Sequence, residues 1–259
     1  MIENMNMNMK LNINMNLKIP KMIMFDYGHT LVYEDSWDGE KASSAVMEYA
    51  VYNKNNLSPA QVAAFSEMLF NETTRMARKY GIEAHEHQYQ NLIYEYLQIK
   101  IDLPPYKIEE VSWDNAAPAH AMPYINETLE HLHRLGIRTA VISNISFSGE
   151  ALKNRINSVL PDNKFEFMIA SSEYVVRKPN KLIFELALRK ADLDANAGDV
   201  WFCGDSVDYD LAGARAAGIY PVWYESEYDC WYIERGSQIK PSYDHLHITD
   251  WRELIKILS

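Results

Sequence analysis

Cysteine is scarce in this chain, with only Cys203 and Cys230 among 259 residues. Two thiols cannot build a disulfide framework, so we expect a fold held by its hydrophobic core in a reducing compartment, the cytoplasm. Hydrophobic residues make up 47% of the chain, enough for such a core. Long apolar runs are also missing, because no segment approaches the roughly 20 residues that span a bilayer. We therefore expect a cytoplasmic protein without a membrane partner.

Basic residues are outnumbered as well: 25 Lys and Arg stand against 36 Asp and Glu, for a net charge of -11. An acidic surface repels nucleic-acid phosphates, so no nucleic-acid partner is expected. A small phosphorylated molecule remains compatible with this balance, because a local pocket can be positive on an acidic protein. The sequence has no internal repeat and does not indicate an oligomeric state.

The first 19 residues alternate Met, Ile or Leu with Asn and Lys, as in the stretch 5–17. A secretory signal would need a continuous apolar segment, which this pattern does not provide. We predict a low-complexity N-terminal tail over 1–19. A ragged edge strand is the alternative that the alternation leaves open.

Residues 40–101 have a helical pattern without intervening strands. Ser58 followed by Pro59 is typical of a helix start, and Gly81 is typical of a helix end. The double proline at 104–105 is expected to end the last of these helices. The sequence therefore predicts an inserted, all-helical domain over 37–114.

The remainder of the chain, 20–36 and 115–259, alternates strands with helices. Such alternation predicts an α/β fold with a doubly wound parallel sheet. The expected strands lie at 22–25, 138–142, 165–170, 200–203, 219–224 and 245–248, and the expected helices at 125–135, 150–160, 181–191, 209–217 and 251–258.

Polar residues follow several of these strands directly. The carboxyl ends of parallel strands meet at one edge of a sheet, where ligands bind. Phosphoryl transfer needs a set of groups of this kind. A carboxylate acts as the nucleophile, a hydroxyl and a lysine bind the phosphoryl oxygens, and further carboxylates bind a divalent ion. Hard oxygen ligands suit Mg²⁺. The residues concerned are Asp26, Ser143, Asn144, Lys178, Asp205 and Asp210.

Four motifs together resemble the haloacid dehalogenase-like (HAD) hydrolase superfamily. They read F-D-Y-G-H-T-L from 25, V-I-S-N from 141, R-K-P-N-K-L-I-F from 177 and W-F-C-G-D-S-V-D-Y-D-L-A-G-A-R-A-A-G from 201. The helical insert resembles the cap of the subclass that places its cap after the first motif. The resemblance implies a Rossmann-like core with a mobile cap.

The resemblance also implies residue roles. Asp26 would be the nucleophile that forms an aspartyl-phosphate, with Lys178 supporting catalysis. Phosphate would be bound by Ser143, Asn144 and Lys178. Mg²⁺ would be held by Asp26, the main-chain carbonyl of Gly28, Asp205 and Asp210. The expected function is a Mg²⁺-dependent phosphatase acting on a small phosphorylated metabolite.

One position departs from the pattern of phosphatases in this superfamily. They usually carry a second Asp two residues after the nucleophile, where this chain has Gly28. Losing a positioned acid can cost about 10²–10⁴-fold in rate. His29 is a candidate substitute proton donor, since its side chain titrates near neutral pH. The alternatives are a dehalogenase-type hydrolase attacking carbon and a phosphate-binding protein of the same fold with impaired catalysis.

Aromatic and histidine residues give weaker signals. Tyr33 and Trp37, with the tyrosine-rich insert, either form a lid over the substrate or pack inside the insert. His85 and His87 are two residues apart, a spacing that points side chains in different directions on a helix. No metal pair is expected there.

Overall fold

The computed structural model describes residues 17–194, 198–226, 228 and 239–259. The predicted N-terminal tail lies almost wholly outside these residues and stays a prediction. Cys230 also lies outside them, whereas Cys203 is buried and unpaired by any disulfide.

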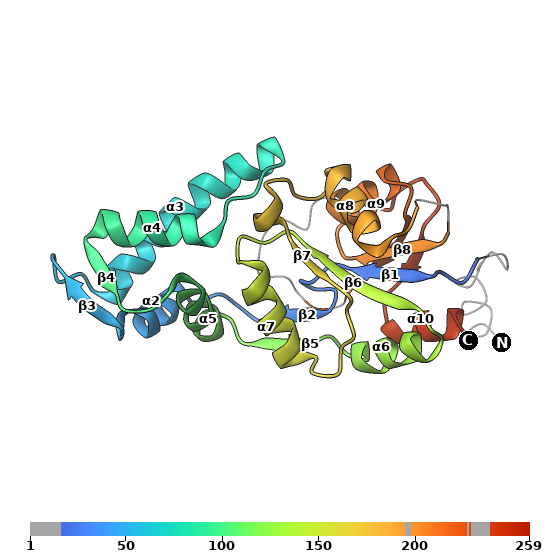
Figure 1. Ribbon diagram of the computed structural model, residues 1–259, viewed down its shortest axis with the longest axis horizontal. Coiled ribbons are helices and arrows are strands. Elements are labelled where there is room, and N and C mark those ends of the chain that lie inside the picture. Colours follow the sequence, from blue (N-terminus) through green and yellow to red (C-terminus); the bar gives the residue numbers. More distant parts are fainter. Residues whose placement is uncertain (1–16, 195–197, 227, 229–238) are drawn as a thin grey trace.

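A six-stranded sheet forms the core, in the order β10-β9-β8-β1-β6-β7. All five strand pairings are parallel, which confirms the predicted α/β sheet. Strand β1 lies inside the sheet, between β6 and β8, so its carboxyl end is flanked by the ends of two neighbours (Figure 1). The strands are β1 Met22–Phe25, β6 Arg138–Ser143, β7 Met168–Ala170, β8 Val200–Gly204, β9 Tyr220–Tyr224 and β10 Leu246–Ile248.

Helices cover both faces of the sheet. Alternate side chains of a strand point to opposite faces, and in β1 Ile23 and Phe25 join one hydrophobic cluster while Met22 and Met24 join the other. The first cluster is completed by α6 (Ile125–Arg134), α7 (Gly149–Val159) and α10 (Trp251–Ile257). The second is completed by α8 (Lys181–Ala191) and α9 (Ala212–Ala216). This two-sided burial is the doubly wound arrangement that the sequence predicts.

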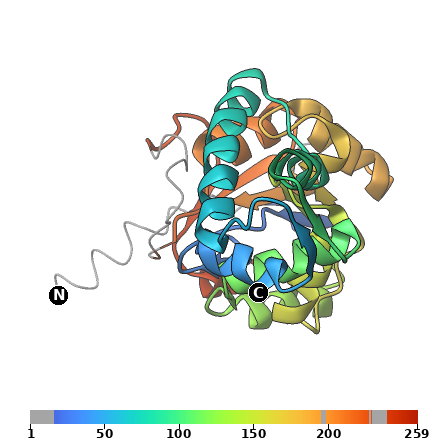
Figure 2. The same ribbon diagram turned by 90° about the vertical axis from the view of Figure 1, so that its left-hand side faces the viewer.

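The insert lies beside the sheet as a separate body of helices (Figure 1). It leaves and rejoins the core through an antiparallel pair, β2 (Val32–Glu34) and β5 (Ala119–Ala121). Its own core includes Val62, Tyr89 and Ile93. Figure 2 looks onto this end of the molecule, with α3 running along one side. The helices are α2 Gly39–Met47, α3 Pro59–Tyr80, α4 Glu86–Leu97 and α5 Pro105–Ala116.

The prediction that the insert is all-helical was wrong in one respect. Strands β3 (Ala50–Asn53) and β4 (Ile99–Ile101) form a short antiparallel pair. Helix α4 ends early because Gln98 adopts a left-handed conformation with φ of 56°, which turns the chain toward β3. The double proline begins helix α5, because Pro105 occupies its first turn, where a missing N–H costs nothing.

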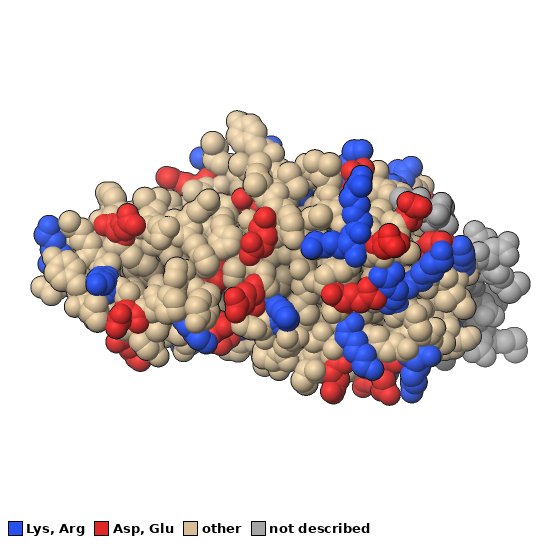
Figure 3. Space-filling model, viewed as in Figure 1, with Lys and Arg blue, Asp and Glu red and all other residues tan. Residues whose placement is uncertain are grey.

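The described surface carries charges of both signs. Basic and acidic side chains are interspersed over the core half of the face in Figure 3. Among the described residues, no helix combines the length and apolar character that crossing a bilayer requires.

Gly213 permits the close packing of α9 against α8, next to the loop that carries Lys178. A Cβ at position 213 would lie 2.9 Å from Phe184 Cζ and 3.0 Å from Pro179 Cα. We predict that Gly213→Ala lowers the free energy of unfolding by about 1–3 kcal/mol through overpacking. Urea denaturation monitored by circular dichroism measures this change.

Gly149→Ala is the matched control. It lies at the start of α7, and the nearest atom to its new Cβ would be Glu173 Cγ at 3.5 Å, an ordinary contact. Its effect should stay within about 0.5 kcal/mol. Equal effects of the two substitutions would contradict the packing argument.

Candidate active site

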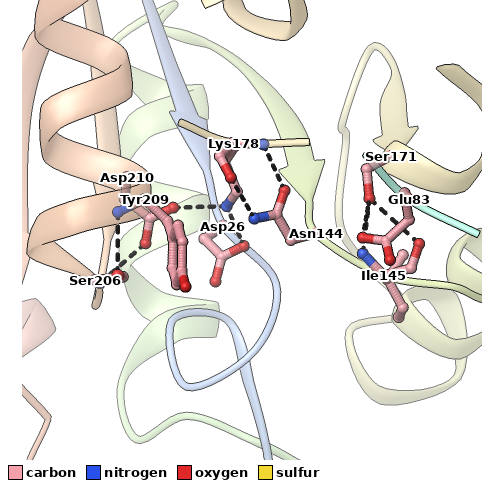
Figure 4. Close-up of polar contacts among 9 residues, drawn as sticks. All are labelled: Asp26, Glu83, Asn144, Ile145, Ser171, Lys178, Ser206, Tyr209 and Asp210. Carbon is pink, nitrogen blue, oxygen red and sulfur yellow. Dashed lines mark hydrogen bonds and ion pairs between the residues drawn. The ribbon is translucent and has the colours of Figure 1, made fainter. Parts of the chain in front are cut away.

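Four of the predicted site residues, Asp26, Asn144, Lys178 and Asp210, lie together at the carboxyl edge of the sheet (Figure 4). Asp26 follows β1, Asn144 follows β6 and Asp205 follows β8, while Lys178 comes from the loop before α8. Asp210 lies in a π-helical turn, Val207–Leu211, that replaces the predicted start of α9. The parallel sheet thus brings residues that are far apart in sequence to one place.

Lys178 is the centre of this group. Its Nζ donates to Asp26 Oδ1 at 2.5 Å and to Asp210 Oδ1 at 2.6 Å, and the residue is only 2% exposed. Burial lowers the pKa of Lys178, but the attraction of Asp210 and Asp26 outweighs it, and the pKa is raised above its ordinary value. Lys178 is therefore a permanent cation at this site.

Asp26 has a perturbed carboxyl group. Burial raises its pKa to about 6, with a further contribution from Asp210, while Lys178 opposes the rise. At pH 7 the carboxylate still predominates, as a nucleophile requires. The N–H of Asp26 donates to the carbonyl of Cys203 at 2.9 Å, which ties the end of β1 to β8.

Asn144 holds the backbone of Lys178 in place. Its Nδ2 donates to the carbonyl of Lys178 at 3.0 Å, and its Oδ1 accepts from the N–H of Lys178 at 2.7 Å (Figure 4). The described contacts of Asn144 are thus those of a positioning residue. Its role as a phosphate ligand stays a prediction.

Three buried carboxylates lie together at this edge. Asp26, Asp205 and Asp210 each offer an oxygen, and these atoms lie within 4.8 Å of one another. Asp210 Oδ2 accepts from the N–H of Ser206 at 3.0 Å. Gly204 allows this approach, because a Cβ at that position would collide with the Asp210 side chain. Such a set of oxygens fits a hard divalent cation.

The turn after Asp26 has an unusual backbone. His29 has φ of 52°, a left-handed conformation uncommon for residues other than glycine. Its N–H donates to the carbonyl of Val32 at 2.8 Å, and its side chain is 1% exposed. Gly28 and His29 both line the cavity that contains Asp26.

A cavity of about 740 Å³ extends from Asp26 to the insert. Ser143 and Trp37 line it as well, whereas Tyr33 is not among its lining residues and instead packs on His120 and Tyr228. Apart from Trp37 and the expectation of a tyrosine-rich lid, the lining residues of the insert were not predicted, because a helical pattern does not indicate which polar side chains face a cavity. Arg177 was not predicted either, although this residue opens the third motif.

His85 and His87 do not point apart as predicted. His85 is the N-cap of α4 with an extended backbone, so helical periodicity does not apply, and the ring centroids lie 4.4 Å apart. Nδ1 of His85 accepts a hydrogen bond from the N–H of His87 at 3.1 Å. When the His85 ring is neutral, its proton is therefore on Nε2, which lies 3.6 Å from Glu173 Oε1. His87 Nε2 lies 3.2 Å from the buried Glu109. The contact of His85 with Glu173 joins the insert to the core, whereas that of His87 with Glu109 lies within the insert. One ligand atom from each of His85, His87 and Glu109 lies within 4.8 Å of the others, so this cluster could hold a metal ion, contrary to the expectation from helical spacing.

Comparisons with known proteins agree on one family. A sequence model of haloacid dehalogenase-like hydrolases matches residues 20–218. A glyceraldehyde 3-phosphate phosphatase of Pyrococcus abyssi is 28% identical over 216 residues, 79% of this chain and 81% of the relative. A ribulose-1,5-bisphosphate 5-phosphatase of Halopiger xanaduensis is 29% identical over 104 residues, 40% of this chain and 42% of the relative.

Solved structures show the same fold. A HAD phosphatase from Thermococcus onnurineus matches with a TM-score of 0.57 at 18% identity, over 92% of this chain and 97% of that one. A 2-haloacid dehalogenase from Pseudomonas syringae matches with a TM-score of 0.59 at 20% identity, over 93% and 98%. At these identities the likeness concerns the fold alone.

Asn144→Ala should destabilise the protein, because the backbone groups of the buried Lys178 would both lose their partner. We expect the free energy of unfolding to fall by about 1–3 kcal/mol. Asn154→Ala is the control, since Asn154 makes an exposed hydrogen bond of 2.9 Å to Glu110. Chemical denaturation of both variants measures the difference, and equal losses would show that Asn144 does not secure the lysine loop.

Proposed function

Because the chain belongs to the haloacid dehalogenase-like hydrolases, we propose that it is a Mg²⁺-dependent phosphatase of a small phosphorylated metabolite. The observation that carries the proposal is the buried contact of Lys178 with Asp26 and Asp210, three residues that line a cavity of about 740 Å³. The two relatives, named for their action on glyceraldehyde 3-phosphate and ribulose 1,5-bisphosphate, support a phosphorylated substrate.

The proposed reaction begins at Asp26. One carboxylate oxygen attacks phosphorus, a new P–O bond forms, and the ester P–O bond breaks with its electrons on the leaving oxygen. Water then attacks the aspartyl-phosphate, which releases phosphate and regenerates Asp26. Lys178 neutralises negative charge on the phosphoryl oxygens during both steps, and Ser143 and Asn144 are the proposed hydrogen-bond donors to them.

The acidic residues fit a Mg²⁺ ion. Asp26, Asp205 and the main-chain carbonyl of Gly28 would hold it, with Asp210 in support. Three carboxylates within 4.8 Å repel one another, and Lys178 offsets only part of that repulsion. When bound, the ion would supply positive charge to the phosphoryl oxygens.

We also propose that residues 37–114 act as a mobile cap over the core at 20–36 and 115–259. Hydrogen bonds join the insert to the core at the boundary where the cap would open. The N–H of Glu83 donates to the carbonyl of Val175 at 2.7 Å, and Ser171 Oγ donates to the Glu83 carboxylate at 2.9 Å (Figure 4). Further contacts join the insert to the core, among them the N–H of Glu86 donating to the carbonyl of Ser146 at 2.8 Å and the ion pair of Arg177 with Glu83, so opening of the cap would have to break these as well. Trp37 and His29 line the cavity and would face a bound substrate, whereas Tyr33 is not among the residues that line the cavity.

Attack at carbon, as in a dehalogenase, is the second candidate. Gly28 favours it, because a side-chain acid two residues after Asp26 is missing. The charged cluster favours attack at phosphorus, because attack on a halocarboxylate does not need two further carboxylates beside the nucleophile. A protein that binds phosphate without turnover is the remaining alternative.

The direct test is Asp26→Asn. The amide is nearly isosteric with the carboxylate but cannot attack phosphorus, so we expect hydrolysis of an aryl phosphate to fall by at least about 10³-fold with an unchanged fold. Steady-state assays with p-nitrophenyl phosphate measure this loss, and circular dichroism checks the fold. Activity near that of the unmodified protein would remove Asp26 from the role.

The same assay separates the alternatives. We expect hydrolysis with Mg²⁺, none with EDTA, and no halide release from 2-chloropropionate. Halide release without Mg²⁺ would establish the dehalogenase instead. Binding of phosphate without hydrolysis of any ester would show that the protein binds phosphate but lacks catalytic activity.

Gly28 leads to a prediction about leaving groups. Without an acid at that position, oxygens that depart readily as anions are favoured, so kcat/KM should be higher for an aryl phosphate than for an alkyl phosphate. Gly28→Asp should raise kcat/KM for the alkyl ester more than for the aryl ester, by at most about 10²–10⁴-fold.

Equal hydrolysis of both esters by the unmodified protein would contradict this prediction and reveal another proton donor. His29→Ala is then the informative variant. A selective loss of alkyl phosphate hydrolysis in that variant would assign the proton to His29.

A further inference from the structure

Gln90 on α4 is a polar residue of the cavity that no role above explains. Its side chain is 5% exposed and lines the cavity that holds Asp26. Among the described residues, neither its amide nitrogen nor its amide oxygen has a hydrogen-bond partner. Because a buried amide without partners is costly, native proteins seldom leave one unpaired. The partner of this amide must therefore come from the contents of the cavity.

Gln90 belongs to a face of α4 that lines the cavity. Glu86, Gln90 and Tyr94 are spaced four residues apart, so they share one side of the helix, and all three line the cavity. Burial and the nearby Glu109 raise the pKa of Glu86 to about 8, which favours the neutral form of this carboxyl group. Gln90 and Tyr94 on the same face offer hydrogen bonds without a formal charge.

Cations are confined to the phosphoryl end of the cavity. Among the described lining residues, the only Lys and Arg are Arg177 and Lys178, neighbours in one loop. Lys178 is paired with Asp26 and Asp210, and Arg177 lies 3.2 Å from Glu83.

Among the described lining residues, those of the insert add carboxylates and no Lys or Arg. Glu40 from α2 and Glu67 from α3 both line the cavity. Both side chains are exposed to solvent. A second anionic group on a substrate would meet these like charges, partly screened by water, which disfavours its binding.

We propose that the site accepts phosphate monoesters whose organic part is uncharged and bears hydroxyl or carbonyl groups, and that Gln90 recognises those groups. This inference rests on the proposed phosphatase function. An amide donates and accepts at once, which matches a hydroxyl or carbonyl partner. A ligand lacking such groups leaves the amide unpaired and binds more weakly, so hydrogen-bonding sites discriminate strongly.

The test compares inhibition constants against p-nitrophenyl phosphate hydrolysis in the presence of Mg²⁺. The inhibitors are matched polyol and alkyl phosphates of three to five carbons, such as glycerol phosphate and propyl phosphate, together with 3-phosphoglycerate and its longer aldonate counterparts. We expect the best polyol phosphate to bind about tenfold more tightly than its alkyl partner, the worth of one such hydrogen bond. The carboxylated esters should bind at least about tenfold more weakly than the polyol phosphates.

Gln90→Leu should bring the polyol-to-alkyl ratio close to one. Gln90→Met, of similar length, is the second variant should Leu impair folding. Asn91→Leu is the matched control, because Asn91 is exposed on the same helix and its substitution should leave the ratio unchanged. Melting temperatures verify that the variants are folded.

An unchanged ratio in the Gln90 variants, or tighter binding of a carboxylated ester than of its neutral counterpart, would overturn the inference. Failure of the unmodified protein to hydrolyse the aryl phosphate would overturn the proposed function instead. Calorimetric dissociation constants for the same esters would then decide the role of Gln90 separately.

Discussion

The buried ammonium of Lys178, held between Asp26 and Asp210, is the contact on which the rest of the site depends. Burying a lone ammonium or a lone carboxylate is expensive, so each of these groups requires the others. One cation among three carboxylates leaves an excess of two negative charges when all are ionised. A divalent cation would balance that excess, and the phosphoryl group would bring its negative charge to Lys178 and the ion together. The need to balance these buried charges therefore links the acidic residues at the edge of the sheet to the proposed divalent cation and phosphoryl group.

The geometry of this charge cluster is fixed by the backbone around it. Asn144 ties down both backbone groups of Lys178, Ser206 orients Asp210, and the missing side chain of Gly204 gives Asp210 its space. These contacts come from loops that follow two different strands and precede α8. The parallel sheet brings the loops together, and hydrogen bonds within and between them then set the distances to the nucleophile.

Much of this could be predicted from the sequence, and the exceptions have identifiable causes. The apolar run ending at Asp26 and the helix 181–191 depend on local pattern and were placed correctly. The pair β3–β4 was missed because its strands are too short to show a period, and a left-handed Gln98 is not evident from residue type. The cluster at His85 was missed because an N-cap residue does not follow helical spacing. Gln90 reads as an ordinary surface residue of a helix until the cavity beside it is known.

The two ends of the cavity constrain the substrate together. At the phosphoryl end, Gly28 offers no side-chain acid, so the leaving oxygen must either be stable as an anion or receive its proton from His29 or water. At the insert end, Glu40 and Glu67 disfavour a second anionic group, while Gln90 offers paired hydrogen-bonding positions. Unless one of these proton donors neutralises it, a negative charge that develops on the leaving oxygen is dispersed within the substrate itself, because the described insert residues of the lining include no Lys or Arg. Leaving-group stability and neutrality of the organic part are therefore two demands that the same cavity places on its substrate.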